Sequence, residues 1–239
     1  MLAVHGLSKS FGNVHALTDF SIRVRDGEAV GLVGPNGAGK TTALRCIAGI
    51  MRPDRATITI GGHDLHRDPV AAKSVLGFVP EIPYPYPHLT VWEHALFIAR
   101  VFQIPGWETK AERLLKLFDL TEKRDAYTAA LSKGMKQKVM LLMAFLHEPT
   151  VLLLDEPLYG IDPRGSHSLK ALVRERLAAG ASVLISSHAM SLIEEVCGSV
   201  SIMTRGRIIA SGTKAELRER AAAPQGANLE EIFVKLTEE

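Results

Sequence analysis

The residues whose types and spacing most clearly suggest a chemical role form a glycine-rich run that ends in a lysine and two threonines. It contains the full pattern G-x-x-x-x-G-K-[ST], in which glycines let successive backbone N–H groups point at one phosphate. Lys40 can reach the terminal phosphates of a nucleotide, and the hydroxyl of Thr41 can bind Mg²⁺. The run therefore predicts a phosphate-binding loop. Its members are Gly34, Pro35, Asn36, Gly37, Ala38, Gly39, Lys40, Thr41 and Thr42.

The flanks of this loop decide between two interpretations. A glycine-rich turn with a solvated lysine would match the pattern by chance and would need no particular surroundings. Here the apolar run at 29–33 is too short for an ordinary helix and predicts a buried strand. Residues 41–50 follow with helical spacing, and the N-terminus of a helix favours negative charge. A strand before the loop and a helix after it favour phosphate binding.

A second candidate site is a pair of acids that follows an apolar run. Residues 151–154 are all apolar and predict a central strand buried on both faces, and Asp155 and Glu156 come next. Ligands of open α/β sheets bind at the carboxyl ends of the strands. Alone, the pair is equally consistent with a strand end that meets solvent. With a phosphate loop in the same chain, Asp155 is predicted to bind Mg²⁺ and Glu156 to act as the general base on an attacking water.

The elements around these residues alternate. Short strands are expected at 2–7, 14–24 and 28–34, with further β-rich segments at 56–65 and 75–80. The later segments 150–157 and 181–188 read as strands on either side of a helix at 168–179, which indicates a parallel sheet. Residues 199–212 predict a terminal hairpin that turns at Arg205-Gly206.

Residues 82–145 have a different character. A proline-aromatic loop at 82–90 cannot form regular structure, and three segments with apolar residues spaced by three and four follow it, at 91–104, 110–120 and 134–147. The prediction is a single α/β domain whose catalytic core, with its β subdomain, comprises 1–81 and 146–212. The helical subdomain is inserted at 82–145, and a helical tail covers 213–239.

Composition narrows the possible functions. Hydrophobic residues make up 46% of the 239 residues, so we expect a hydrophobic core. The formal net charge is only +2, so we do not expect the basic face that is typical of nucleic-acid-binding proteins. Cys46 and Cys197 are far apart and outside any C-x-x-C pair, which favours two small buried residues over a disulfide or a metal site. The N-terminus shows no signal peptide, and no apolar run is long enough to span a bilayer.

The order of motifs resembles that of ABC ATPase subunits over nearly the whole chain. The phosphate loop is followed by 131–138, then by the acid pair, then by 160–163, then by 186–188. The second of these segments separates this family from other phosphate-loop proteins, and usually reads L-S-G-G-Q. Leu131, Ser132 and Gly134 match that pattern, whereas Lys133 and Met135 depart from it. The variant resembles the branch that serves ABC-2 type exporters.

The resemblance implies a fold and an arrangement of subunits. The fold is that of a phosphate-loop NTPase of the RecA-like type, with a mostly parallel sheet core, an N-terminal antiparallel β subdomain and the inserted helical subdomain. Ser132 and Gly134 would contact the γ-phosphate of ATP bound to a second ATPase subunit, and a serine before a helix is also an ordinary N-cap; both interpretations hold together. The segment 160–163 would contact the opposite subunit, although it could be a simple turn.

Three further residues receive roles from the resemblance. His188 lies where the family has a histidine that senses γ-phosphate, and Phe11 lies where an aromatic ring packs on adenine, although a lone phenylalanine is more often part of the core. Glu81 stands where the family usually has a glutamine whose oxygen approaches Mg²⁺ and the attacking water. A carboxylate keeps the acceptor oxygen and adds negative charge beside Asp155 and Glu156. Glu81 is therefore predicted to keep both the catalytic and the metal-binding role.

The resemblance implies an ATP-binding and ATP-hydrolysing subunit that powers transport, and it favours export as the direction of transport. The cofactors would be ATP and Mg²⁺, and the partners a membrane-spanning permease and a second ATPase subunit, identical or related. The subunit would lie in the cytoplasm, attached through its partner to the inner face of the cell membrane. Two rivals stay open: an ABC ATPase acting on nucleic acid or ribosomes, and a non-hydrolytic regulatory module. The aromatics of 82–98 fit an interface with the permease as well as they fit packing of the insert.

Overall fold

The computed structural model describes residues 1–237, and its centre is a six-stranded sheet in the order β10-β9-β3-β8-β7-β6. Five neighbouring strands are parallel, and β10 pairs antiparallel with β9 at one edge. The sheet is therefore mostly parallel, as the sequence predicted. Its strands are β3 (Ala29–Val33), β6 (Leu76–Val79), β7 (Val151–Asp155), β8 (Ser182–Ser186), β9 (Ser199–Thr204) and β10 (Arg207–Gly212).

A second, four-stranded antiparallel sheet has the order β2-β1-β4-β5. Strand β1 (Leu2–Phe11) pairs along its length with β2 (Val14–Val24) and on its other side with β4 (Arg55–Ile60), and β5 (His63–Asp64) closes the edge. The expectation that the first strand ends at residue 7 was wrong. Pairing with β2 continues to Phe11, across register shifts that follow Val4, Leu7 and Lys9, and β4 pairs as far as Ser8, so backbone pairing extends β1 beyond its apolar part.

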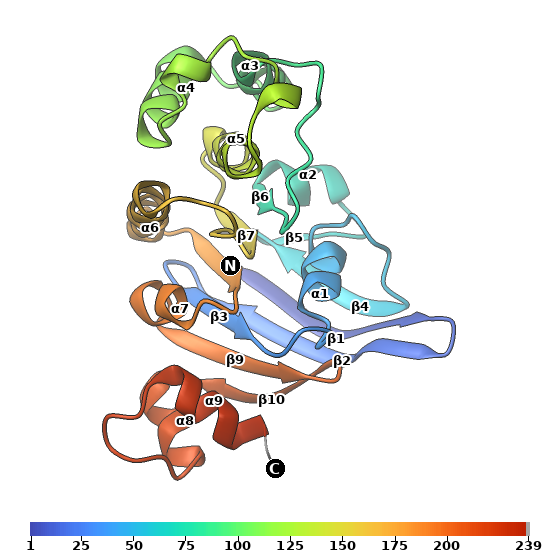
Figure 1. Cartoon of the computed structure of the whole chain (residues 1–239). Helices are drawn as coiled ribbons and strands as arrows, with labels where there is room; N and C mark the ends of the chain where they lie inside the picture. Colours follow the sequence, from blue (N-terminus) through green and yellow to red (C-terminus); the bar gives the residue numbers. More distant parts are fainter. Residues whose placement is uncertain (238–239) are drawn as a thin grey trace.

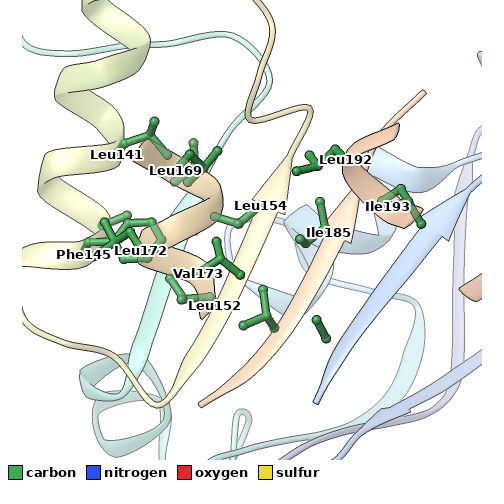
Figure 2. Packing of buried hydrophobic residues seen from close by; sticks show 14 of the residues in the cluster. Leu141, Phe145, Leu152, Leu154, Leu169, Leu172, Val173, Ile185, Leu192 and Ile193 are labelled. Atoms are coloured by element: carbon green, nitrogen blue, oxygen red, sulfur yellow. The ribbon is translucent and has the colours of Figure 1, made fainter. Parts of the chain in front are cut away.

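Alternating residues of the central strands face two separate cores. Leu152 and Leu154 pack in the core under the later helices, whereas Val151 and Leu153 pack in the core between the two sheets. This alternation follows from the two-residue period of a strand. Figure 2 shows Leu152 and Leu154 beside Leu172 and Val173. A strand buried on both faces is held rigidly, so the acids at its end have a fixed position.

Helices cover the sheets and extend to both ends of the molecule. In Figure 1, α3 to α5 gather at one end and α8 and α9 at the other, and the central sheet lies between them. The helices are α1 (Lys40–Ile47), α2 (Pro69–Ser74), α3 (Val91–Val101), α4 (Trp107–Leu117), α5 (Lys133–Leu146), α6 (Pro163–Ala178), α7 (Met190–Val196), α8 (Lys214–Arg220) and α9 (Leu229–Thr237), with short 3₁₀ turns at Thr121–Lys123 and Thr128–Ala130. The domain boundaries at 82, 146 and 213 remain a prediction.

Two helices illustrate local control by the sequence. Helix α3 begins with a capping box, in which Thr90 and Glu93 each accept a hydrogen bond from the other's backbone N–H. Helix α2 was not predicted, because its six residues are too few to show helical periodicity. It begins at Pro69, and the side chain of Asp68 accepts from the N–H of Ala71.

The two cysteines are free, Cys46 buried and Cys197 partly buried. Burial raises the pKa of the Cys46 thiol to about 11 and that of Cys197 to about 12. Both thiols are therefore protonated and chemically inert at neutral pH. None of the helices within residues 1–237 combines the length and the apolar character needed to cross a bilayer.

Candidate active site

A cavity of about 810 Å³ opens where the phosphate loop meets the carboxyl ends of β7 and β8. Ligand sites of open α/β sheets lie at this edge. The cavity is lined from several segments that are distant in sequence. They are 14–16, 36–42, Glu81, Glu156, Tyr159, Ser186, His188 and 205–206.

The phosphate loop connects β3 to α1 and is shaped by its backbone. Gly39 precedes the helix in the left-handed region with φ 105°, a conformation that a residue with a side chain rarely adopts. The N–H of Gly206 donates to the carbonyl of Ala38 at 2.9 Å, so the β9–β10 turn supports the loop. A rigid loop at a helix N-terminus presents its N–H groups as a preformed anion site.

Lys40 is buried in this loop, with 8% of its surface exposed. Its ammonium donates to the carbonyls of Gly34 at 2.7 Å and Pro35 at 3.1 Å. Burial lowers the pKa of Lys40 below its ordinary value, and the carboxylates of Glu156, Asp155 and Glu81 partly oppose that shift. The three acids predicted for the site therefore all act on the ammonium that is predicted to bind phosphate.

Asp155 ends β7 and is almost fully buried, with 1% of its surface exposed. Its Oδ1 accepts from the hydroxyl of Ser186 at 2.7 Å, and its Oδ2 is buried with no hydrogen-bond partner within residues 1–237. Burial raises the pKa of this carboxyl, against the lowering effect of the hydroxyls of Ser186 and Thr41. A buried carboxylate oxygen without a donor beside a threonine hydroxyl fits a hard cation.

No group of three His, Cys, Asp or Glu able to hold a metal ion occurs in the part of the chain that the structure describes. Such a cage is not needed for Mg²⁺, which proteins usually bind through one or two side chains together with phosphate oxygens of the substrate. Thr41 and Asp155 therefore fit Mg²⁺ that arrives with a nucleotide.

Glu156 is fixed by the segment that follows β8. Its Oε2 accepts from the hydroxyl of Ser187 at 3.1 Å and lies 2.8 Å from Nδ1 of His188, and its Oε1 accepts from the N–H of His188 at 2.9 Å. Glu156 also has φ 46°, which is unusual outside glycine. Its orientation is thus set by several contacts and by a strained backbone.

The structure brings most of the predicted site residues to the cavity or into contact with its lining, as for Gly34, Pro35 and Asp155, and it leaves three others apart from the cavity. Ser132 and Gly134 begin α5 and do not line the cavity. Ser132 is the helix N-cap, since its hydroxyl accepts from the N–H of Met135 at 3.2 Å. Phe11 is 48% exposed and also lies outside the lining, to which the same hairpin contributes Val14 instead. Contact of Phe11 with adenine stays a prediction.

Several lining residues were missed by sequence reasoning. Arg205 was predicted only as part of a hairpin turn, and its segment reaches the cavity because β9 lies beside β3. Tyr159 follows Glu156 by three residues and carries no motif of its own. His15 belongs to a hairpin that reaches the loop, and its Nδ1 lies 3.0 Å from the hydroxyl of Ser10. Tertiary structure alone gathers these residues.

Known proteins share both this sequence pattern and this fold. The family model described as ABC transporter matches residues 17–159. The chain belongs to the ABC transporter family. The ABC-type transporter ATP-binding protein EcsA of Bacillus subtilis is 36% identical over 100% of this chain and 97% of its own length. The Nod factor export ATP-binding protein I of Paraburkholderia xenovorans is 36% identical over 95% of this chain and 74% of its own length.

Solved structures agree with the family assignment. A structure described as the ATP-binding subunit of an ABC transporter has 37% identity and a TM-score of 0.94 over 99% of both chains. A dimeric ATP-binding cassette bound to ADP and Pi in a post-hydrolysis state has a TM-score of 0.81 over 89% of this chain, at 21% identity, and supports the fold alone. This ABC transporter subunit is therefore an ATPase that powers transport, and ABC ATP-binding subunits work with membrane permeases.

Proposed function

We propose that two copies of this chain, or this chain and a related ATPase, bind two ATP molecules between them in a head-to-tail arrangement. Lys40 of one copy and Ser132 of the other contact the same triphosphate. The supporting observation is that Ser132 and Gly134 lie outside the cavity that holds Lys40 and Glu156, so a second copy is needed to bring them to the phosphate. Two-fold symmetry then completes both sites at once.

Hydrolysis at this site proceeds by attack of water on the γ-phosphorus. Glu156 takes the proton of that water as the new P–O bond forms, and the bond from the γ-phosphorus to the oxygen of the β-phosphate breaks. Lys40 and the loop N–H groups stabilise the negative charge on the phosphates. Thr41 and Asp155 hold Mg²⁺, which when bound neutralises charge on the phosphates. His188 orients Glu156 through the contacts described above.

Glu81 follows β6 and lines the cavity beside these groups. We expect Glu81→Ala to lower the turnover of ATP about tenfold, because it removes an acceptor oxygen near the attacking water, and a positioned polar group contributes at least that much. Glu81→Gln keeps such an oxygen and should stay within about threefold of the wild type. Phosphate release at saturating Mg-ATP measures both. Unchanged turnover in the alanine variant would remove Glu81 from the mechanism.

The membrane permease is proposed to bind the aromatic face, which consists of Tyr84, Tyr86, Phe97 and Tyr127. All four side chains are exposed, Tyr84 at 65%, and the rings of Tyr86 and Phe97 meet edge to face at 5.7 Å. Trp92, by contrast, packs on Trp107 inside the helical part. The tyrosines of this segment thus fit an interface and its tryptophan fits internal packing.

Hydrogen bonds between two side chains and the backbone of Tyr86 hold the loop of the aromatic face in place. The N–H of Tyr86 donates to Nε2 of His94 at 2.8 Å, and the hydroxyl of Thr128 donates to the carbonyl of Tyr86 at 2.7 Å. A groove of about 340 Å³ runs along Tyr84 and Tyr86 beside Lys136. The occupant would be a short segment of the permease with apolar residues and an acid that pairs with Lys136.

Purification of the tagged chain from membranes in detergent tests this function. We expect a membrane-spanning chain to co-purify with the wild type, and the double variant Tyr84→Ala, Tyr86→Ala to lose most of it with unchanged ATP affinity, because large aromatic residues dominate interface energies. Val70→Ala is the matched control, since Val70 is exposed on α2 and outside this face. Recovery of RNA or DNA in place of a membrane chain would favour the rival function.

Export is the proposed direction of transport. The name of the relative from Paraburkholderia xenovorans refers to export of Nod factor, and that of a 33% identical relative from Bacillus subtilis refers to linearmycin resistance. The departures from the L-S-G-G-Q pattern at Lys133 and Met135 also resemble the branch of the family that serves ABC-2 type exporters. Through its permease the chain would work at the inner face of the cell membrane.

A further inference from the structure

Lys133, which departs from the family pattern, contacts the segment that follows Glu156. Its ammonium nitrogen lies 3.8 Å from the centre of the Tyr159 ring, within the range of a cation–π interaction. None of the ion pairs found within residues 1–237 includes Lys133. The face of this ring is therefore the main attachment of the Lys133 charge.

Tyr159 connects this contact to the candidate general base. The N–H of Tyr159 donates to the carbonyl of Glu156 at 3.0 Å and closes a tight turn. Tyr159 also lines the same cavity as Glu156. Because Glu156 holds an unfavourable left-handed conformation, a turn that relaxes would rotate its carboxylate away from the site.

Two other contacts attach the same segment to α5. A Cβ atom added to Gly134 would lie 2.2 Å from the carbonyl oxygen of Gly160, so the two backbones meet more closely than any side chain allows. The ammonium of Lys138 pairs with the carboxylate of Asp162 at 2.5 Å. These contacts fix the start of α5 against the turn, and of the three only the contact of Lys133 reaches a residue that lines the cavity.

We propose that Lys133 and Tyr159 form a pair of positioning residues that holds Glu156 in its catalytic orientation. This inference rests on the proposed function, since it takes Glu156 as the base. Tyr159 is 48% exposed, so without the ammonium its ring has little to keep it in one rotamer. The segment that contains Ser132, Lys133 and Gly134 thereby controls hydrolysis at the site of its own chain. The same segment also contacts the nucleotide bound to the partner subunit.

A double-mutant cycle on turnover of the full chain tests the pair. The variants are Lys133→Met, which keeps an unbranched side chain without charge, Tyr159→Leu, and the two combined. We expect each single variant to lower kcat about three- to fivefold with unchanged KM for ATP, in line with the strength of one cation–π contact. The combined variant should be no slower than either single variant, because both remove the same interaction.

Conservative variants distinguish a role in orienting Glu156 from a role in maintaining the fold. Tyr159→Phe keeps the ring face and Lys133→Arg keeps the cation, so both should stay within about twofold of the wild type. Lys123→Met is the matched control, because Lys123 lies in an exposed 3₁₀ turn outside the cavity. Should Tyr159→Leu fail to fold, Tyr159→Gln, which also lacks a ring face, takes its place in the same cycle with the same expected result.

Each alternative outcome has a definite meaning. Additive losses in the combined variant, or a raised KM with wild-type kcat in Lys133→Met, would overturn the positioning role. An inactive wild-type chain would instead overturn the proposed function. The two failures are therefore distinguishable in one set of assays.

Discussion

Glu156→Gln is expected to abolish most turnover and to leave the chain as a dimer filled with ATP. The amide has the shape of the carboxylate and retains an oxygen that can accept from the N–H of His188. It cannot take a proton from the attacking water, and general base catalysis typically contributes about 10²- to 10⁴-fold. We therefore expect kcat to fall by that range while ATP affinity is retained, as measured by phosphate release and by equilibrium dialysis.

The dimer follows from the thermodynamics of the proposed arrangement. Contacts between the subunits form through the bound triphosphate, so an uncleaved γ-phosphate maintains the assembly and hydrolysis ends it. Analytical ultracentrifugation of Glu156→Gln should show a dimer with Mg-ATP and a monomer with Mg-ADP. The matched control is Glu122→Gln on an exposed 3₁₀ turn, which should behave as the wild type. A monomeric Glu156→Gln at saturating Mg-ATP would contradict the shared site.

Local signals were enough to predict the elements that carry the site. The strand before Gly34 and the strand before Asp155 were both predicted, since a short apolar run between turn residues is typical of a buried strand. The order of strands in the sheet was not predictable from those signals. Strand β3 lies between β8 and β9, which come much later in the chain, a placement fixed by long-range packing.

The same limit applies to the residues of the site. A motif such as the phosphate loop reveals itself because several residues share one task within one short segment. Tyr159 and Arg205 have no such companions in sequence, and only the fold brings them to the cavity. Phe11 is the reverse case, because it was predicted to be a site residue and does not line the cavity. Its position in the motif order suggested a contact with adenine, but its side chain is half exposed and lies outside the lining in this structure.

Lys40→Ala is expected to weaken ATP binding about 10- to 100-fold, since one or two charge-assisted hydrogen bonds to phosphate are lost. Turnover should fall further, because the ammonium also stabilises charge that develops on the leaving phosphate. The free energy of unfolding should change little. Truncation removes two bonds to the loop carbonyls of Gly34 and Pro35, and it also removes the cost of burying an ammonium.

The charges around Lys40 add a further consequence for Lys40→Ala. Burial lowers the pKa of this ammonium and three carboxylates partly oppose that shift, so removal of Lys40 takes a cation away from Glu81, Asp155 and Glu156 and increases their repulsion of the triphosphate. High salt should therefore recover part of the lost affinity in Lys40→Ala, because screening weakens that repulsion. Titration calorimetry at two salt concentrations measures the effect, with Lys123→Ala as the matched control. An affinity and a turnover equal to those of the wild type would mean that another cation holds the phosphates.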